Sequence, residues 1–246
     1  MKPLYLLYVI YQWLIAAPIL IVLTILTAVL TIVLAPIFPN SQLSYFPARW
    51  WSRLCCWLLF IRVKTNGFEH LNKNQSYIFI ANHQSIFDIF VIYGWIPFIF
   101  KWIMKNDLIK IPFVGMACAT AGHIFIDRSN PIAAKHSIEK AADKLKHGNS
   151  VVVFPEGTRT RTGKMGKFKR GAFMLAQELA LPLVPITLSG SFERLHRNTL
   201  KVHPGIITMT VHAPISPDTF TAENTNEIMQ KAYKTIESGL QPTIVQ

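Results

Sequence analysis

The feature that most constrains this chain is a long N-terminal stretch without charge: Pro3–Ala48 holds no acidic or basic side chain. Within it, Pro3–Phe38 is almost wholly apolar. A bilayer core of about 30 Å is crossed by about 20 helical residues. A helix of this length must therefore tilt, bend near Pro18 or leave the membrane. A signal peptide is disfavoured, because its apolar region is shorter and no A-x-A-like site follows here.

The next segment, Leu43–Val63, mixes three arginines with tryptophans and leucines. Arg49 and Arg53 lie one helical turn apart, so they share a helix face. Such a pattern is typical of an amphipathic helix at the membrane interface with aromatic anchors. A second membrane span is the alternative.

Charge around the apolar run predicts its orientation. Four basic residues follow it within residues 49–64, whereas only Lys2 and the α-amine precede it. The more positive flank remains in the cytoplasm, and a hairpin would leave both ends there. We therefore expect membrane-anchoring hydrophobic and interfacial helices at 1–63 and a cytoplasmic domain at 64–246.

The composition limits the classes of molecule that we expect the protein to bind. With 25 Lys and Arg against 13 Asp and Glu, the net charge is +12. Anionic membranes or phosphorylated substrates are therefore expected. Nucleic acid is disfavoured, because the basic residues form no recognisable nucleic-acid motif with interleaved aromatics. The cysteines, Cys55, Cys56 and Cys118, lack zinc-ligand spacing, so we expect no metal and a reducing compartment.

Beyond residue 64 the chain alternates strand-like and helix-like segments, which is typical of an α/β domain. The expected strands are short apolar runs rich in Val, Ile and Phe, buried on both faces: Tyr77–Ala81, Pro97–Phe100, His123–Ile126, Val151–Phe154, Leu183–Leu188 and Ile206–His212. The expected helices are Ser85–Tyr93, Pro131–His147, Phe168–Leu181 and Ala222–Ser238.

A base and a carboxylate lie close together in the string NHQSIFD, which contains His83 and Asp88. The string follows an apolar strand and opens a helix, the place where α/β sheets usually form sites. Asp88 can reach back to one ring nitrogen of His83, which leaves the other free to take a proton. A structural His–Asp pair behind a capping Asn82 is the alternative.

The string FPEGTR offers a place for a phosphate. Gly157 lets backbone approach a ligand closely, and Arg159 gives a planar cation suited to phosphate. Glu156 is either an acid or a cap. The basic residues that follow suit a solvated loop touching anionic lipid better than a binding site: Arg161, Lys164, Lys167, Lys169 and Arg170.

Two further cations stand near predicted elements. Lys105, in KNDLIKIPFVG, is either a phosphate contact or a surface lysine at a helix start. Arg128 follows Asp127 at the end of the segment GHIFIDR. It is either a phosphate contact or one half of a local surface ion pair with Asp127. Other catalytic layouts fit worse: the chain has no G-x-S-x-G, P-loop or H-E-x-x-H motif. Ser85 is too near His83 along the turn to be its nucleophile.

Five motifs in order, NHQSIFD, KNDLIKIPFVG, GHIFIDR, FPEGTR and LVPITL, resemble those of the 1-acylglycerol-3-phosphate (lysophosphatidate) acyltransferases, over residues 82–188. The resemblance implies a mixed α/β sheet flanked by helices, with an N-terminal membrane helix or helix pair. It also implies that His83 is the general base and Asp88 its partner. Binding of the acceptor's glycerol phosphate then falls to Lys105, Arg128, Glu156, Gly157, Thr158 and Arg159.

The implied reaction moves an acyl group from acyl-CoA or acyl carrier protein to the sn-2 hydroxyl of lysophosphatidate, without a cofactor. The product is phosphatidate. Two alternatives remain: an acyltransferase for another lysophospholipid, glycerol phosphate or an aminolipid, and a non-catalytic membrane lipid-binding protein. We expect a membrane-bound protein of the bacterial inner membrane, with its catalytic domain facing the cytoplasm.

Overall fold

The computed structural model describes residues 3–127, 149–219 and 223–240. In this part of the chain, seven strands form one sheet in the order β1-β7-β6-β2-β5-β3-β4. Only the β6–β7 pair is antiparallel, so the sheet is mixed, as predicted. The strands are β1 (Ile61–Asn66), β2 (Ile78–Ala81), β3 (Phe100–Lys105), β4 (Ile124–Ile126), β5 (Ser150–Val153), β6 (Leu183–Ser189) and β7 (Gly205–Val211).

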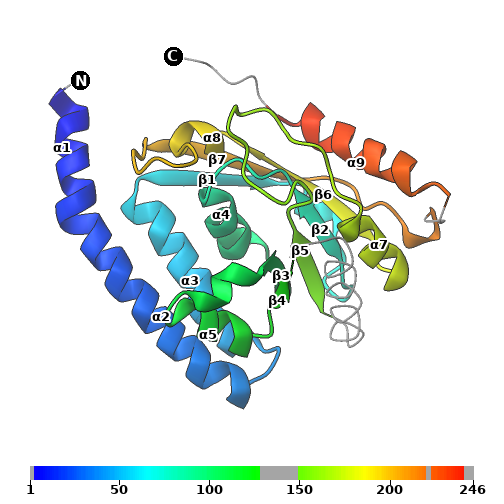
Figure 1. Ribbon diagram of the computed structural model, residues 1–246, viewed down its shortest axis with the longest axis horizontal. Helices are drawn as coiled ribbons and strands as arrows, with labels where there is room; N and C mark the ends of the chain where they lie inside the picture. Colours follow the sequence, from blue (N-terminus) through cyan, green and yellow to red (C-terminus); the bar gives the residue numbers. More distant parts are fainter. Residues whose placement is uncertain (1–2, 128–148, 220–222, 241–246) are drawn as a thin grey trace.

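Helices cover both faces of the sheet (Figure 1). In β2, Phe79 packs into one core cluster while Ile78 and Ile80 pack into the other, because successive strand side chains point to opposite faces. The Phe79 face is covered by α3 (Gln42–Leu58) and α4 (Phe87–Trp95), and the other face by α7 (Gly171–Glu178) and α9 (Thr225–Ser238). Shorter elements connect these: η2 (Phe68–His70), η3 (Asn106–Lys110), α5 (Val114–Thr120), α8 (Ser191–Arg194) and η4 (Pro217–Thr219).

The N-terminal stretch forms one long, curved helix along the side of the molecule (Figure 1). It comprises α1 (Pro3–Tyr11), a π-helical turn η1 (Gln12–Ala16) and α2 (Ala17–Ile37). The π turn ends two residues before Pro18, near which a bend was one of the three predicted outcomes, and proline lacks an N–H and crowds the preceding turn. Among the described residues this is the one helix long and apolar enough to cross a membrane, by length and composition alone. Only 11% of its most apolar window is buried.

Helix α3 packs between α2 and α4. Trp51 Nε1 donates to Thr24 Oγ1 of α2 at 3.0 Å. On the other side Arg53 Nε donates to the carbonyl of Gly94 at 2.7 Å, and Arg49 Nη2 donates to the carbonyl of Ile96 at 3.4 Å. Both arginines therefore place positive charge at the C-terminal end of α4, where the helix dipole favours it.

Most predicted elements are present, but some are not. Strand β3 begins at Phe100, so the strand predicted over Pro97–Phe100 was wrong. Strand β1 was missed because it is an edge strand with mostly exposed side chains, and it begins three residues before the predicted domain start at residue 64. Helix α5 was also missed, and the helix predicted over Pro131–His147 lies outside the described residues.

We expect Arg53→Met to lower the free energy of unfolding by about 1–3 kcal/mol, because it removes a charged hydrogen-bond donor from the end of α4. Urea unfolding of the detergent-solubilised protein measures this. Arg62→Met, which removes a charge from an exposed position of β1, is the matched control. Equal losses in the two variants would contradict the assigned role of Arg53.

Candidate active site

The site begins where β2 ends. The side chain of buried Asn82 makes two hydrogen bonds to the backbone of Leu188 in the neighbouring strand β6, at 2.8 and 2.7 Å. This holds the start of the turn 82–86 against the sheet. The turn then leads into α4, so His83 lies at the carboxyl edge of parallel strands, where ligands bind in sheets of this kind.

The structure brings His83 and Asp88 together, as their spacing predicted. His83 Nδ1 lies 2.9 Å from Asp88 Oδ2. The same oxygen accepts the backbone N–H groups of Gln84 at 2.6 Å and Ser85 at 2.7 Å. Asp88 is fully buried in the first turn of α4, where the helix dipole favours a negative group. The turn therefore holds the carboxylate still, and the carboxylate orients the ring.

The ring of His83 has one free nitrogen. Because a carboxylate oxygen accepts, Nδ1 carries the hydrogen and Nε2 presents a lone pair. In the described part of the chain Nε2 makes no hydrogen bond. The ring stacks on Phe154, with centroids 3.9 Å apart and planes 7° apart, and 13% of the side chain is exposed. This is the geometry of a fixed base open on one side.

Glu156 connects the histidine turn to the basic loop. Its Oε1 accepts the backbone N–H of His83 and its Oε2 accepts the backbone N–H of Gly166, both at 2.7 Å. Only 6% of the residue is exposed. Burial raises the pKa of Glu156 to about 7, although the two N–H groups act in the opposite direction. Both oxygens are bonded to backbone, so the side chain holds the two segments in register.

The glycine turn lies beside this bridge. Gly157 has a φ of +75°, which favours glycine, and the N–H of Thr160 donates to the carbonyl of His83 at 2.9 Å. Thr158 is exposed and Arg159 is half-buried. Among the described residues the Arg159 guanidinium is not ion-paired. One backbone hydrogen bond therefore joins the chain after Arg159 to the backbone of His83.

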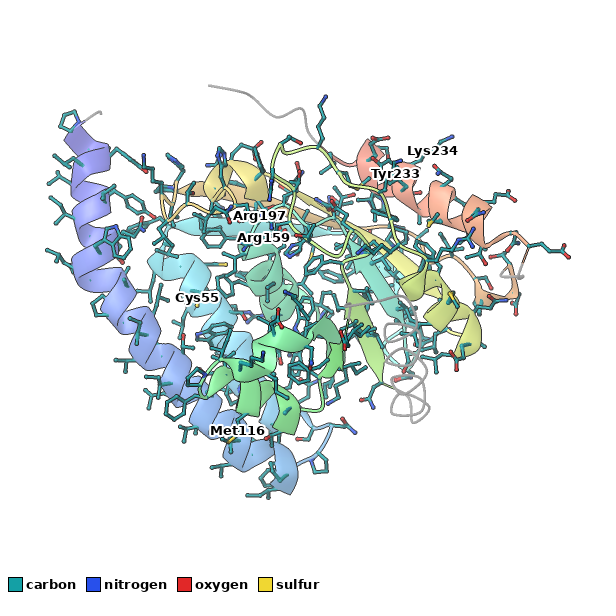
Figure 2. The ribbon with its side chains drawn as sticks, viewed as in Figure 1. Cys55, Met116, Arg159, Arg197, Tyr233 and Lys234 are labelled. Carbon is teal, nitrogen blue, oxygen red and sulfur yellow. The ribbon has the colours of Figure 1, made fainter. Side chains whose placement is uncertain are left out.

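Sequence reasoning missed one residue of this site, Arg197, which follows α8. Its Nη1 donates to Thr158 Oγ1 at 3.0 Å and to the carbonyl of Arg159 at 2.9 Å. Figure 2 shows Arg159 and Arg197 next to each other above α4. No motif marks Arg197, so only the tertiary contact identifies it.

Among the described residues, no hydrogen bond or ion pair joins Lys105 to His83 or to the glycine turn. Lys105 ends β3 at the same edge of the sheet, and its exposed ammonium is ion-paired with Asp107. It begins a 3-10 turn, as the surface-lysine reading expected. Arg128 lies outside the described residues.

Comparison with known proteins gives the family. The Acyltransferase family model matches residues 62–189, more than half of the chain. The chain belongs to the Acyltransferase family. A 1-acyl-sn-glycerol-3-phosphate acyltransferase of Cocos nucifera is 36% identical over 182 residues, covering 74% of this chain and 58% of the relative. The enzyme of that name from Pseudomonas aeruginosa is 36% identical over 162 residues, covering 64% and 62%.

A solved member of this acyltransferase group has the same fold. The crystal structure of the 1-acyl-sn-glycerophosphate acyltransferase PlsC from Thermotoga maritima has a TM-score of 0.79, with 26% identity over 97% of this chain and 95% of that one. The chain spans about three-fifths of the length of the two curated relatives.

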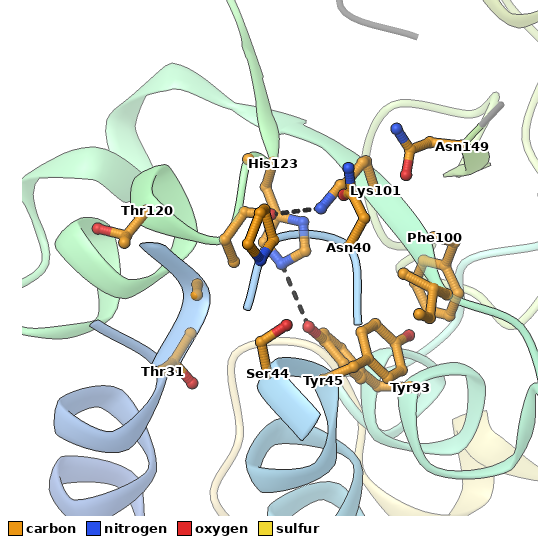
Figure 3. Close-up of a pocket in the computed structure, with 15 residues that line it drawn as sticks. Thr31, Asn40, Ser44, Tyr45, Tyr93, Phe100, Lys101, Thr120, His123 and Asn149 are labelled. Carbon is orange, nitrogen blue, oxygen red and sulfur yellow. Dashed lines mark hydrogen bonds between the residues drawn. The ribbon is translucent and has the colours of Figure 1, made fainter. Parts of the chain in front are cut away.

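The protein also contains a cavity of about 300 Å³ away from His83. Lys101, at the start of β3, and His123, just before β4, line it together with Tyr45 and Tyr93 (Figure 3). These are the amino ends of parallel strands, opposite the edge that carries His83. Burial lowers the pKa of His123 to about 3, so this ring is neutral. The cavity is therefore separate from the candidate active site.

Glu156 should give the stability of this protein a specific pH dependence. Its pKa rises from 4.5 to about 7 on folding, so the folded state favours the protonated form. This stabilisation is complete below pH 4.5 and is lost as pH rises to about 7, and it amounts to about 3 kcal/mol. Urea unfolding from pH 5 to 8 should show this loss relative to Glu156→Gln, which does not titrate.

Glu178→Gln, at an exposed position of α7, is the control for the Glu156 measurement. Its unfolding profile should follow the wild-type protein at each pH. If the profiles of Glu156→Gln and the wild-type protein were parallel over this range, the assigned titration would be wrong.

Proposed function

We propose that this protein transfers a fatty acyl group from acyl-CoA or acyl carrier protein to the sn-2 hydroxyl of 1-acylglycerol 3-phosphate, forming phosphatidate. The observation that carries the proposal is the orientation of the His83 ring by Asp88, which leaves Nε2 without a hydrogen bond among the described residues. The names of the relatives and of the solved structure support the same acceptor.

The reaction requires one proton relay. His83 Nε2 takes the proton of the acceptor hydroxyl as its oxygen attacks the thioester carbonyl. The new C–O bond forms, the C–S bond breaks, and the imidazolium returns the proton to the leaving thiolate. Asp88 keeps the ring in the correct tautomer and stabilises its charged form. A positioned general base of this kind contributes about 10²–10⁴-fold in rate.

The acceptor's phosphate is assigned to the glycine turn. Gly157 allows close approach of backbone, and Arg159 supplies a two-pronged cation that matches phosphate oxygens. Thr158 lines the same turn, with Lys105 and Arg128 as additional phosphate contacts in this proposal. Glu156 serves by position, because both of its oxygens hold backbone N–H groups.

The long N-terminal helix is assigned to the membrane. Large apolar side chains along it are exposed, including Leu4, Leu14 and Ile21 at 79%, 72% and 61%. Burying such surface in lipid is favourable. The proposed location is the bacterial inner membrane, with residues 64–246 on the cytoplasmic side, where acyl donors are made.

The purified protein in detergent, assayed with lysophosphatidate and either donor, tests the function. His83→Ala should lower turnover by about 10²–10⁴-fold without loss of fold, and Asp88→Asn should lower it by a similar or smaller factor. His70→Ala, at an exposed position, is the control. Near-normal turnover in His83→Ala would remove the proposed base.

A panel of acceptors separates the alternatives. Preference for another lysophospholipid, glycerol phosphate or an aminolipid over lysophosphatidate would replace the acceptor and keep the reaction. Binding of lysophosphatidate without transfer from either donor would identify a lipid-binding protein. We expect phosphatidate as the main product.

Arg159→Lys should not behave as a conservative change. Lysine keeps the charge but loses the planar fork, so the KM for lysophosphatidate should rise about 10-fold with little change in the KM for the donor. Steady-state kinetics with each substrate varied in turn measures this. Arg161→Lys, at an exposed position of the same loop, is the control. Equal changes for both substrates would indicate a structural Arg159.

A further inference from the structure

Arg197 is connected to the candidate base through a single peptide group. Its Nη1 donates to the carbonyl of Arg159 at 2.9 Å. The N–H of the same peptide, which belongs to Thr160, donates to the carbonyl of His83 at 2.9 Å. The carbonyl of this planar peptide therefore binds the Arg197 side chain, and its N–H binds the backbone of His83 on the opposite side. This places the guanidinium beside both the base and the glycine turn.

The segment that carries Arg197 is held in place by contacts with the same site. Ser85 Oγ, in the histidine turn, donates to the carbonyl of Leu195 at 2.8 Å. The His196 ring stacks on Phe192, with centroids 4.4 Å apart. Asn198 has a φ of +64°, which reverses the chain directly after Arg197. Arg197 is thus positioned by a buried hydrogen bond two residues before it and by the chain reversal directly after it.

The charge at this place is not balanced within the described structure. The Arg197 side chain contacts the backbone carbonyl of Arg159, and among the described residues neither arginine is ion-paired with a carboxylate. Nη1 of Arg197 is used by the turn, whereas its Nε and Nη2 have no hydrogen-bond partner among the described residues. The described residues thus leave donors of Arg197 and the charge of both side chains unsatisfied at this turn, and a bound anion would meet them.

We propose that Arg197 is the second cation of the acceptor's phosphate site and sets the preference for a phosphomonoester. This inference rests on the proposed function and extends it to a residue outside the motifs. A phosphomonoester carries a charge of about −1.5 to −2 at pH 7. Two guanidinium groups match that charge, whereas a phosphodiester headgroup carries one charge and a glycerol headgroup none. The pair therefore favours lysophosphatidate over other lysophospholipids and monoacylglycerol.

Kinetics of Arg197→Gln test the proposal. The KM for lysophosphatidate should rise about 10- to 100-fold, as for the loss of a charged hydrogen-bond donor, with kcat and the donor KM within about threefold. Arg197→Lys should recover part of the loss. Lys201→Gln removes the same charge from an exposed position of the same connection and should change none of these constants. A fall in kcat with unchanged acceptor KM would show that Arg197 only shapes the turn, and would overturn the proposal.

A measurement on the wild-type protein avoids any folding defect of the variants. Phenylglyoxal modifies accessible arginines, and mass spectrometry of peptides locates each adduct. Glycerol 3-phosphate should protect both Arg159 and Arg197, whereas glycerol should protect neither, and Arg161 should react equally throughout. Equal modification of Arg197 with and without glycerol 3-phosphate would overturn the proposal.

These outcomes are distinct from a failure of the proposed function. Protection by glycerol 3-phosphate reports binding alone and needs neither the acyl donor nor His83. A protein that binds this anion through Arg197 but transfers no acyl group would contradict the proposed reaction and retain the anion site. An active enzyme in which Arg197 is unprotected would support the proposed reaction and contradict the anion site.

Discussion

Two buried carboxyl groups hold the turn that carries His83, and the rest of the candidate site depends on their hydrogen bonds. Asp88 accepts hydrogen bonds from the His83 ring and from two backbone N–H groups, and Glu156 accepts one from the backbone N–H of His83. A carboxylate taken out of water costs several kcal/mol unless such donors meet it. The turn supplies three donors to Asp88 Oδ2, whereas the two backbone N–H groups on Glu156 offset its burial only in part, because its pKa is still raised to about 7. A histidine held at both its ring and its backbone needs little reorganisation to act as a base.

The sheet explains why distant segments meet there. Strands β6, β2 and β5 are neighbours, and β2 runs parallel to both of the others. Their carboxyl ends therefore lie at one edge, from which β2 leads to His83, β5 to Gly157 and Arg159, and β6 through α8 to Arg197. Base, glycine turn and second arginine come from three places in the sequence. Parallel pairing brings the backbone of His83 and the side chain of Arg197 within hydrogen-bond distance of the segment Thr158–Thr160.

The sequence could predict those features that leave a pattern in neighbouring residues, and it missed those that depend on contacts between distant segments. The central strands are buried on both faces, so their apolar runs indicated β2, β5 and β6 directly, and the H-x4-D spacing indicated the meeting of His83 and Asp88. Edge strand β1 has too few buried positions to leave such a pattern. Glu156 was ambiguous because both of its partners are backbone groups, which carry no residue type. Arg197 had no local signal, because its contacts lie 38 and 39 residues away.

Helix α4 also bears on how a soluble form of this protein could be engineered. Its first turn contains Asp88, its last carbonyls are capped from α3, and the opposite side of α3 bonds and packs against the long apolar helix. Removing residues 1–40 would expose that side of α3 and leave the Trp51 side chain without its partner Thr24. A water-soluble variant would therefore need polar replacements on the uncovered surface of α3 as well as a shorter chain. Without them, the freed surface would favour self-association.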